Sequence, residues 1–201
     1  MGRKYINVVE TAKLLRQALR EALPGVKFGV RSSSYSGGAS INVTWTDGPN
    51  TQQVEAVTNT FKGGYFDGMI DYKGSVYHKL DGEDVRFGAD FIFTHRDYSD
   101  EAVARAIDRV TKRFGGCEAI TVADYHKGNA WGWTNSGGCD MNRALSDQLA
   151  RHSDRMFLGA SPTCARVAAA GDDGYGMGTV GDGTPGNGGQ GYPRVPVRAG
   201  T

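Results

Sequence analysis

The sequence predicts an α+β protein in which helices cover one face of an antiparallel β-sheet, followed by a Gly-rich, disordered C-terminal tail. Three observations indicate this class: strands that alternate apolar and polar residues, amphipathic helices between them, and a last segment dominated by glycine. With 201 residues, of which 39% are hydrophobic, the chain is long enough for one core of ordinary size. We expect one compact main domain with additions.

A first helix is predicted over residues 8–23. Asn7 followed by Glu10 resembles a capping box, and Pro24-Gly25 ends the helical pattern. The apolar residues that recur at helical spacing are Val8, Ala12, Leu15, Leu19, Ala22 and Leu23. The opposite face carries positive charges three and four positions apart, namely Lys13, Arg16 and Arg20.

Two alternating strands are predicted within residues 26–45. Val30 and Ile41 are core-facing positions, and Arg31 and Asn42 are solvent-facing ones. Residues 32–39, between the strands, are rich in serine and glycine and form a longer connection than a hairpin turn requires. We therefore predict a mobile polar loop, which either serves recognition or is a tolerated insertion.

The middle of the chain is predicted to hold a short helix and several strands. Residues 47–50 read as a turn into the helix, which Gly63-Gly64 ends, and irregular strands follow within residues 65–80. A longer strand is predicted over residues 85–94, with Phe91 and Phe93 facing the core. His95 continues this inward alternation.

Three more elements are predicted in the second half of the chain. Ser99 caps a helix that presents Phe114 inward and that Gly115-Gly116 ends. Residues 119–123 are predicted as a strand, and Asp140 opens a last helix that ends near residue 152.

An aromatic segment without any periodicity lies between these last two elements, at residues 125–133. Tyr125, Lys127, Trp131 and Trp133 suit a protein interface or the stacking of bases, because exposed aromatic side chains are costly without a partner. Packing against the last helix would explain them equally well. We predict a second exposed surface here and keep both interpretations.

The C-terminal segment is predicted to be disordered. Ten of the 21 residues from 171 to 191 are glycine, so the segment has too few apolar residues to offset its chain entropy. The predicted organisation is therefore an α+β domain over residues 1–128, an aromatic loop with a helix over 129–160, and a Gly-rich tail over 161–201.

The charge balance excludes a strongly basic nucleic-acid coat and an acidic mimic of DNA, because 23 Lys and Arg face 22 acidic residues. Cys117, Cys139 and Cys164 form no CxxC pair, and their odd number argues against a secreted disulfide framework. The sequence has no apolar run of membrane-span length and no signal-peptide pattern. These features predict a cytoplasmic protein with reduced thiols.

Few features of the sequence favour an enzymatic function. His95 near Asp97 and Asp100 could form a catalytic pair, but a bond to a helix-capping carboxylate is the simpler interpretation. His78 and His126 are predicted to lie at the surface. We predict no metal and no cofactor, because no tight pair of zinc ligands occurs and no Lys-Ser/Thr pair follows the glycines. The residues considered for zinc are Cys117, Cys139, His126 and His152.

Parts of the sequence resemble the large polyvalent protein-associated domains of phages and conjugative elements. The resemblance rests on residues 30–43 (VRSSSYSGGASINV), 45–49 (WTDGP), 66–71 (FDGMID) and 87–99 (FGADFIFTHRDYS). It extends from about Tyr5 to about Tyr125. Such domains occur in multi-domain proteins thought to enter the host with the element's DNA, or as stand-alone proteins, which implies a context of protection from host defence.

We therefore predict a stand-alone anti-defence protein, not an enzyme, that inhibits a host nuclease complex of the CRISPR or restriction type by occupying its surface. The predicted partner-binding residues are Arg31, Ser33, Ser34, Tyr35, Tyr125, Lys127, Trp131 and Trp133. The alternative is a nucleic-acid-binding accessory protein of a mobile element. Its predicted phosphate contacts are Lys13, Arg16, Arg20, Lys27, Arg86 and Arg109. An enzyme that uses His95 is the third hypothesis.

Overall fold

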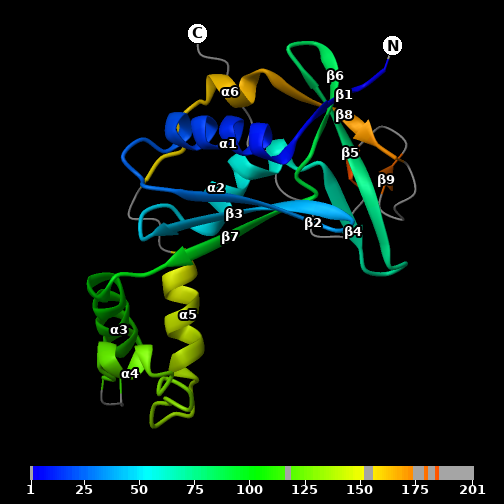
Figure 1. The fold of residues 1–201 in the computed structure, drawn as a ribbon. Coiled ribbons are helices and arrows are strands. Elements are labelled where there is room, and N and C mark those ends of the chain that lie inside the picture. The colour runs from blue at the N-terminus through cyan, green and yellow to red at the C-terminus, as the bar shows by residue number, and fades with distance from the viewer. Residues whose placement is uncertain (1, 116–118, 152–155, 174–178, 181–183, 186–201) are drawn as a thin grey trace. The chain divides into compact units, whose positions relative to one another are not determined.

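The computed structural model describes residues 2–115, 119–151, 156–173, 179–180 and 184–185 (Figure 1). Its helices and strands confirm the predicted α+β class. They form two compact units, which we describe separately. The first unit comprises residues 2–44, 52–95 and the described residues from 157 onward, and the second comprises 45–51 and 96–156. The boundaries predicted at 128/129 and 160/161 do not coincide with this division.

The first unit holds most of the strands, and two of them, β3 and β7, continue into the second unit. Its elements are β1 (Lys4–Ile6), α1 (Val8–Ala22), β2 (Gly29–Tyr35), β3 (Gly38–Thr46), α2 (Thr51–Thr58), a 3-10 helix η1 (Asn59–Phe61), β4 (Gly64–Asp67), β5 (Tyr72–Leu80), β6 (Glu83–Phe87), β7 (Phe91–Asp97), α6 (Pro162–Ala165), β8 (Val167–Asp172), β9 (Thr179–Val180) and β10 (Thr184–Pro185).

The strands form a five-stranded sheet, a three-stranded sheet and the short β9–β10 pair. The larger sheet has the order β1-β6-β5-β4, with β8 also paired to β5, and the smaller has the order β2-β3-β7. Strands β4, β6 and β8 pair with β5 antiparallel, and β2 pairs with β3 in the same way. Strand β1 departs from the expected antiparallel pattern, because it pairs with β6 in parallel.

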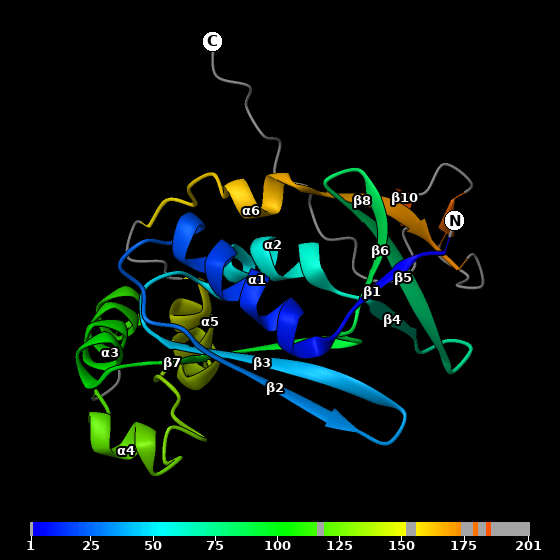
Figure 2. The ribbon, with the colours of Figure 1, turned by 45° about the horizontal axis from the view of Figure 1, so that its top comes forward.

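Helix α1 forms as predicted and covers one face of the β2–β3 hairpin, as Figures 1 and 2 show. The side chain of Asn7 caps it by accepting a hydrogen bond from the N–H of Glu10 (2.9 Å). All six predicted apolar positions of the helix are buried. Val30, Ile41 and Val43 are buried on the hairpin, so the predicted alternation of its strands is confirmed.

The predicted mobile loop at residues 32–39 is wrong. Tyr35 pairs directly with Gly38, and the register continues without interruption to Gly29 opposite Thr44. The connection is therefore the two residues Ser36 and Gly37, and Gly37 adopts φ 88°, a left-handed conformation that glycine tolerates. The serines belong to a strand because the pairing of β2 with β3 continues to the tip of the hairpin.

The predicted single strand over residues 85–94 is two strands, β6 and β7. Gly88, Ala89 and Asp90 separate them, and this break reverses the alternation that follows. Ile92 is consequently buried, whereas Phe93 is 56% exposed and His95 is also exposed. The prediction that Phe91, Phe93 and His95 face the core is therefore wrong.

The second unit is mainly helical. It contains α3 (Asp100–Phe114), α4 (Val122–His126) and α5 (Met141–Arg151). Ser99 and Gly115 cap α3 as predicted, but Phe114 is partly exposed. The strand predicted over residues 119–123 is wrong, because Thr121 and Asp124 form a complete capping box that starts α4. The core consists of Val103, Ala106, Ile107, Val110, Trp133, Met141, Leu145 and Leu149.

The C-terminal region begins with ordered structure, so the predicted tail over residues 161–201 is too long. Helix α6 packs against α1, and β8 pairs with β5 from Val76 to Leu80. Apart from the short strands β9 and β10, the Gly-rich part beyond residue 173 lies outside the described residues. Among those residues, no helix combines the length and the apolar character that crossing a bilayer requires.

Candidate functional site

Strand β2 presents a row of side chains to solvent. Arg31, Ser33 and Tyr35 occupy every second position and are all exposed, with Tyr35 at 50%. The strand geometry places them on one face, opposite the buried Val30. Ser34 has the other parity and lines a cavity described below. The four hairpin residues predicted to bind a partner are thus exposed, but on two different faces.

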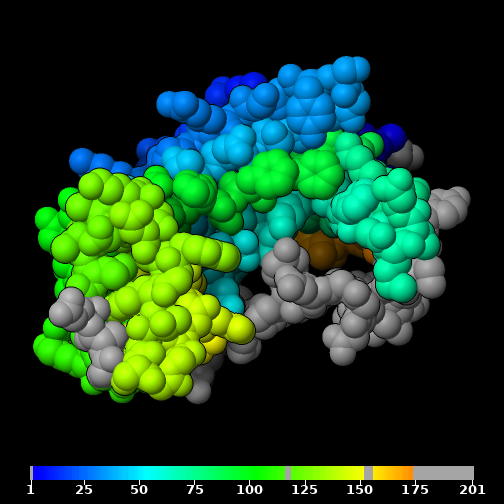
Figure 3. Space-filling model, turned by 90° about the horizontal axis from the view of Figure 1, so that it is seen from below, coloured from blue at the N-terminus to red at the C-terminus, as the bar shows by residue number. Residues whose placement is uncertain are grey.

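An aromatic pair extends this polar row on the same three-stranded sheet. The rings of Phe91 and Phe93 are stacked with centroids 6.0 Å apart, and Phe93 is exposed. Figure 3 shows the green surface of β7 uncovered between the blue and cyan hairpin and the teal β4–β5 segment. We define the outer face as Arg31, Ser33, Tyr35, Phe91 and Phe93.

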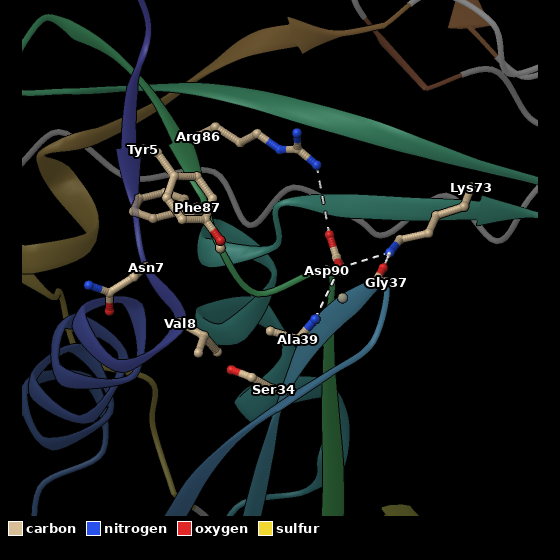
Figure 4. A pocket seen from close by; sticks show the side chains of 12 residues that line it. Tyr5, Asn7, Val8, Ser34, Gly37, Ala39, Lys73, Arg86, Phe87 and Asp90 are labelled. Carbon is tan, nitrogen blue, oxygen red and sulfur yellow. Dashed lines mark hydrogen bonds and ion pairs between the residues drawn. The ribbon is translucent and has the colours of Figure 1, made fainter.

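A cavity of about 460 Å³ lies between the hairpin tip, the start of α1 and the larger sheet (Figure 4). The residues that line it come from segments far apart in the sequence. They are Tyr5, Asn7, Val8, Ser34, Gly37, Gly38, Ala39, Lys73, Arg86, Phe87, Gly88 and Asp90.

Asp90 is the most connected polar residue of the cavity and is only 8% exposed. Its Oδ2 accepts hydrogen bonds from Nζ of Lys73 (2.8 Å) and from the N–H of Ala39 (3.2 Å). Nζ of Lys73 also donates to the carbonyl of Gly37 (3.2 Å). A Cβ at Gly38 would lie 2.5 Å from Oδ2 of Asp90, so a larger residue at position 38 would force this carboxylate to shift. Asp90 thus fastens the hairpin tip to the beginning of β7.

Arg86 is the second cation of the cavity, and its guanidinium is weakly paired. Its NH2 lies 3.9 Å from Oδ1 of Asp90, which is an ion-pair distance but too long for a hydrogen bond. Within the described part of the chain, Nε of Arg86 is buried without an acceptor. Tyr5, the register partner of Arg86 on β1, is 61% exposed beside it.

The aromatic segment at residues 125–133, predicted to form a second exposed surface, is partly buried and partly exposed. Trp133 is 8% exposed and belongs to the core of the second unit, and Tyr125 packs against that core. Burial of Tyr125 raises the pKa of its hydroxyl. Trp131, at 86% exposed, and Lys127 remain at the surface. Packing of the last helix therefore explains Trp133.

The residues predicted to contact phosphates have different surroundings in the structure. Lys13, Arg20 and Lys27 are exposed in the first unit. Arg16 instead donates from NH2 to the carbonyl of Val30 (2.6 Å) and joins α1 to β2. Arg86 lines the cavity, and Arg109 lies exposed on α3 in the second unit.

The histidines that the structure describes differ in burial, and the side chain of His95 is exposed. His78 is 4% exposed, so its predicted surface position is wrong, and burial lowers its pKa to about 4. Nε2 of His126 lies 2.8 Å from Oδ1 of Asp100 at the surface. In the part of the chain that the structure describes, no three His, Cys, Asp or Glu side chains converge as metal ligands.

Two carboxylates fasten the C-terminal segment, and the sequence reasoning missed both. Glu21 accepts from the Oγ of Ser161 (2.7 Å) and from the N–H of Thr163 (2.9 Å), and these bonds lower its pKa to about 2. Asp173 accepts from the hydroxyl of Tyr65 (2.8 Å) and the N–H of Ser75 (2.6 Å). Nothing local in the sequence reveals such long-range pairs.

Residues 6–99 match the family model described as large polyvalent protein associated domain 29. This segment of the chain is therefore similar to large polyvalent protein associated domains. The match covers a little under half of the 201 residues and ends earlier than the expected limit near Tyr125. It includes the whole hairpin and every cavity residue except Tyr5. No curated protein and no solved structure matches the chain significantly.

One overlooked sequence signal would have placed Arg86 more accurately. Asp81-Gly82 joins β5 to β6 in a two-residue turn, with φ 53° and 85°. Asp-Gly between alternating strands is among the strongest hairpin signals, because both turn positions require φ above zero. The signal predicts that β6 returns beside β5, and therefore that Arg86 lies on the same sheet as Lys73.

Proposed function

We propose that the protein acts for a phage or plasmid in the cytoplasm of its host, where it binds a nuclease complex of the CRISPR or restriction type and blocks it by occupying its surface. The observation that carries this proposal is the exposed row Arg31, Ser33 and Tyr35 within the polyvalent protein associated domain. The domain type supplies the mobile-element context, and the row supplies a surface suited to a protein partner.

The composition of the outer face supports contact with a protein. Tyrosine and arginine are enriched among residues that dominate interface energies, and the exposed aromatic Phe93 lies on the same sheet. Covering solvated aromatic side chains with a partner removes apolar surface from water, which stabilises the complex. Serine at position 33 adds a hydrogen-bonding group between the two larger side chains.

The rigidity of the hairpin also supports binding by simple contact. Seven consecutive residue pairs hold β2 against β3, and Arg16 and Asp90 fix the hairpin to α1 and β7. A preformed strand loses little conformational entropy on binding, so most of the contact energy contributes to affinity. Inhibition of this kind needs no turnover and no cofactor.

A cleavage assay tests the proposal. Nuclease complexes recovered from defence-bearing hosts, with the protein as bait, are purified and titrated with the protein during cleavage of labelled DNA. We expect cleavage to stop at about one protein per complex. The double variant Arg31→Ala/Tyr35→Ala should need at least about tenfold more protein, because two hot-spot side chains are lost.

The matched control is Lys79→Ala, which removes an exposed cation of β5 away from the outer face. It should inhibit like the unmodified protein. Full cleavage at a tenfold excess of protein, for every CRISPR and restriction complex tried, would contradict the proposed inhibition. Complete inhibition at far less than one protein per complex would contradict contact as the mechanism and would point to an enzyme.

A nucleic-acid-binding accessory protein is the second candidate. The exposed cations Lys13, Arg20 and Lys27 in the first unit favour it. If these cations bind phosphates, the affinity for a DNA fragment should fall steeply as salt rises, because counterions are released on binding. Absence of a DNA shift at low salt would remove this candidate and would leave the inhibitor proposal untouched.

A further inference from the structure

The cavity shares no residue with the outer face and has polar groups of its own. Its lining places donors from three distant segments around one space: the guanidinium of Arg86, the ammonium of Lys73 and the hydroxyl of Ser34 (Figure 4). The side chains arrive there through the β5–β6 turn and the hairpin register, and not through neighbouring positions in the chain. The volume of about 460 Å³ falls in the range of small-ligand sites in proteins.

The charges of the cavity leave one cation without a close partner. Asp90 and Lys73 compensate each other at 2.8 Å, and the N–H of Ala39 also stabilises the carboxylate. Arg86 reaches Asp90 only at 3.9 Å, and its buried Nε has no hydrogen-bond acceptor among the described residues. The cavity therefore carries a net positive charge that is concentrated on a guanidinium with five N–H donors.

A guanidinium with free donors matches the geometry of an oxyanion. Arginine binds phosphate or carboxylate through two parallel hydrogen bonds, which are stronger than neutral ones. The first turn of the 15-residue helix α1, through Val8, also lines the cavity, so the positive end of its dipole adds to the field there. A phosphate suits these four sources of positive potential or donor groups better than a carboxylate does, because it carries up to two negative charges and three acceptor oxygens.

We propose that this cavity binds the phosphate group of a phosphorylated ligand, with Arg86 as the principal contact and Lys73 and Ser34 as further donors. Asp90 acts as a positioning residue, because it holds Lys73 and the hairpin tip in place. The exposed ring of Tyr5 beside Arg86 leaves a surface for the organic part of the ligand. The site is independent of the inhibitor proposal, since it shares no residue with the outer face.

Such a phosphate could belong to a free nucleotide or to the 5′ end of a nucleic acid. Calorimetric titration of the full chain at fixed ionic strength separates the two sources. The probes are AMP, adenosine, and one single-stranded oligonucleotide with and without a 5′-phosphate. We expect the phosphorylated member of at least one pair to bind about tenfold or more tightly than its partner, because charged hydrogen bonds are lost without the phosphate.

Variants assign the effect to the cavity. Arg86→Gln should weaken the phosphorylated probe about tenfold or more, and Arg86→Lys, which keeps the charge but loses the fork, should weaken it less. Lys79→Gln removes an exposed cation of β5 that does not line the cavity, and it should change the affinity less than about twofold. Circular dichroism confirms that each variant is folded before titration.

Preference for AMP alone would assign the site to nucleotides, and preference for the phosphorylated oligonucleotide alone would assign it to nucleic-acid ends. Equal binding within both pairs, or no binding of any probe at millimolar concentration, would overturn the proposed phosphate site. An equal loss of affinity in Arg86→Gln and Lys79→Gln would also overturn it, because the effect would then be one of net charge.

Discussion

Strand β2 and the segment 125–133 both carry aromatic and cationic side chains, but only β2 presents its set together to solvent. On β2, a two-residue period directs Arg31, Ser33 and Tyr35 to one side whatever their chemistry, because backbone pairing fixes the strand. In segment 125–133 no regular period exists, and Trp133 is drawn into the helical core while Trp131 stays outside. The pairing of a regular strand can thus hold apolar side chains at the surface. In an irregular segment, each side chain is buried or exposed according to its own packing.

This comparison predicts that two tryptophan substitutions will differ greatly in their effect on stability. Trp133→Ala should reduce the free energy of unfolding by about 3–5 kcal/mol, because it removes a large side chain from a packed core. The matched control Trp131→Ala should change it by less than about 0.5 kcal/mol. Urea unfolding followed by circular dichroism measures both. Similar losses for the two variants would show that residues 125–133 do not divide into a core and a surface tryptophan.

The first unit should also show a pH response that originates at His78. The folded protein keeps His78 neutral down to a pKa of about 4, whereas the unfolded chain takes up a proton near the ordinary value of 6.5. Stability should therefore fall as the pH drops from 6.5 to 4, by up to about 3 kcal/mol. Urea unfolding at pH 7, 5.5 and 4.5 measures the slope.

The control for this response is His78→Leu, which fills the same buried position without titrating. The variant should lose most of the slope between pH 6.5 and 4 but keep the changes below pH 4.5 that come from carboxylates. An identical pH dependence in the variant and the original protein would contradict the assignment to His78. Half-exposed His126, in the second unit, provides no comparable burial.

A smaller effect is expected where the C-terminal segment joins the first unit. Glu21→Gln keeps the shape but loses the charge that strengthens the bonds from Ser161 and Thr163. We expect a loss of about 1 kcal/mol and faster amide exchange at Thr163. Since the pKa of Glu21 is about 2 in the fold and 4.5 without these contacts, the difference between the two proteins should disappear as the pH falls from 4.5 to 2. A difference that persists at pH 2 would contradict this origin.

The smallest change in stability is expected on the outer face. Tyr35→Ala should alter the free energy of unfolding by less than about 0.5 kcal/mol, because half of the side chain is already in water. Its binding to a nuclease complex should nevertheless weaken, as the proposed function requires. A loss of stability comparable to that of Trp133→Ala would mean that Tyr35 serves the fold and not a partner.

The sequence predicted those features that depend on near neighbours. The caps at Asn7, Ser99 and Gly115, and the buried faces of α1 and α3, follow from spacing within a few residues. The break at residues 88–90 was missed because alternation continues across it in the sequence while the backbone turns. The tight hairpin was missed because its serines resemble a loop, although they pair in full register.

The cavity could not be predicted in the same way. Tyr5, Ser34, Lys73, Arg86 and Asp90 meet only because three pairings bring distant segments together: β1 with β6, β5 with β6, and the hairpin tip with Asp90. Pairing partners at such separations are not encoded in any local pattern of one sequence. The turn at Asp81-Gly82 identifies one of the three pairings, which is why Arg86 alone was within reach of sequence reasoning.

Hydrogen exchange of the protein, alone and bound to a recovered nuclease complex, compares β2 and segment 125–133 most directly. If the outer face is the contact surface, amides of Gly29–Tyr35 should gain protection in the complex, and those around Trp131 should not. Protection that appears at residues 125–133 and leaves β2 unchanged would contradict the proposed binding face.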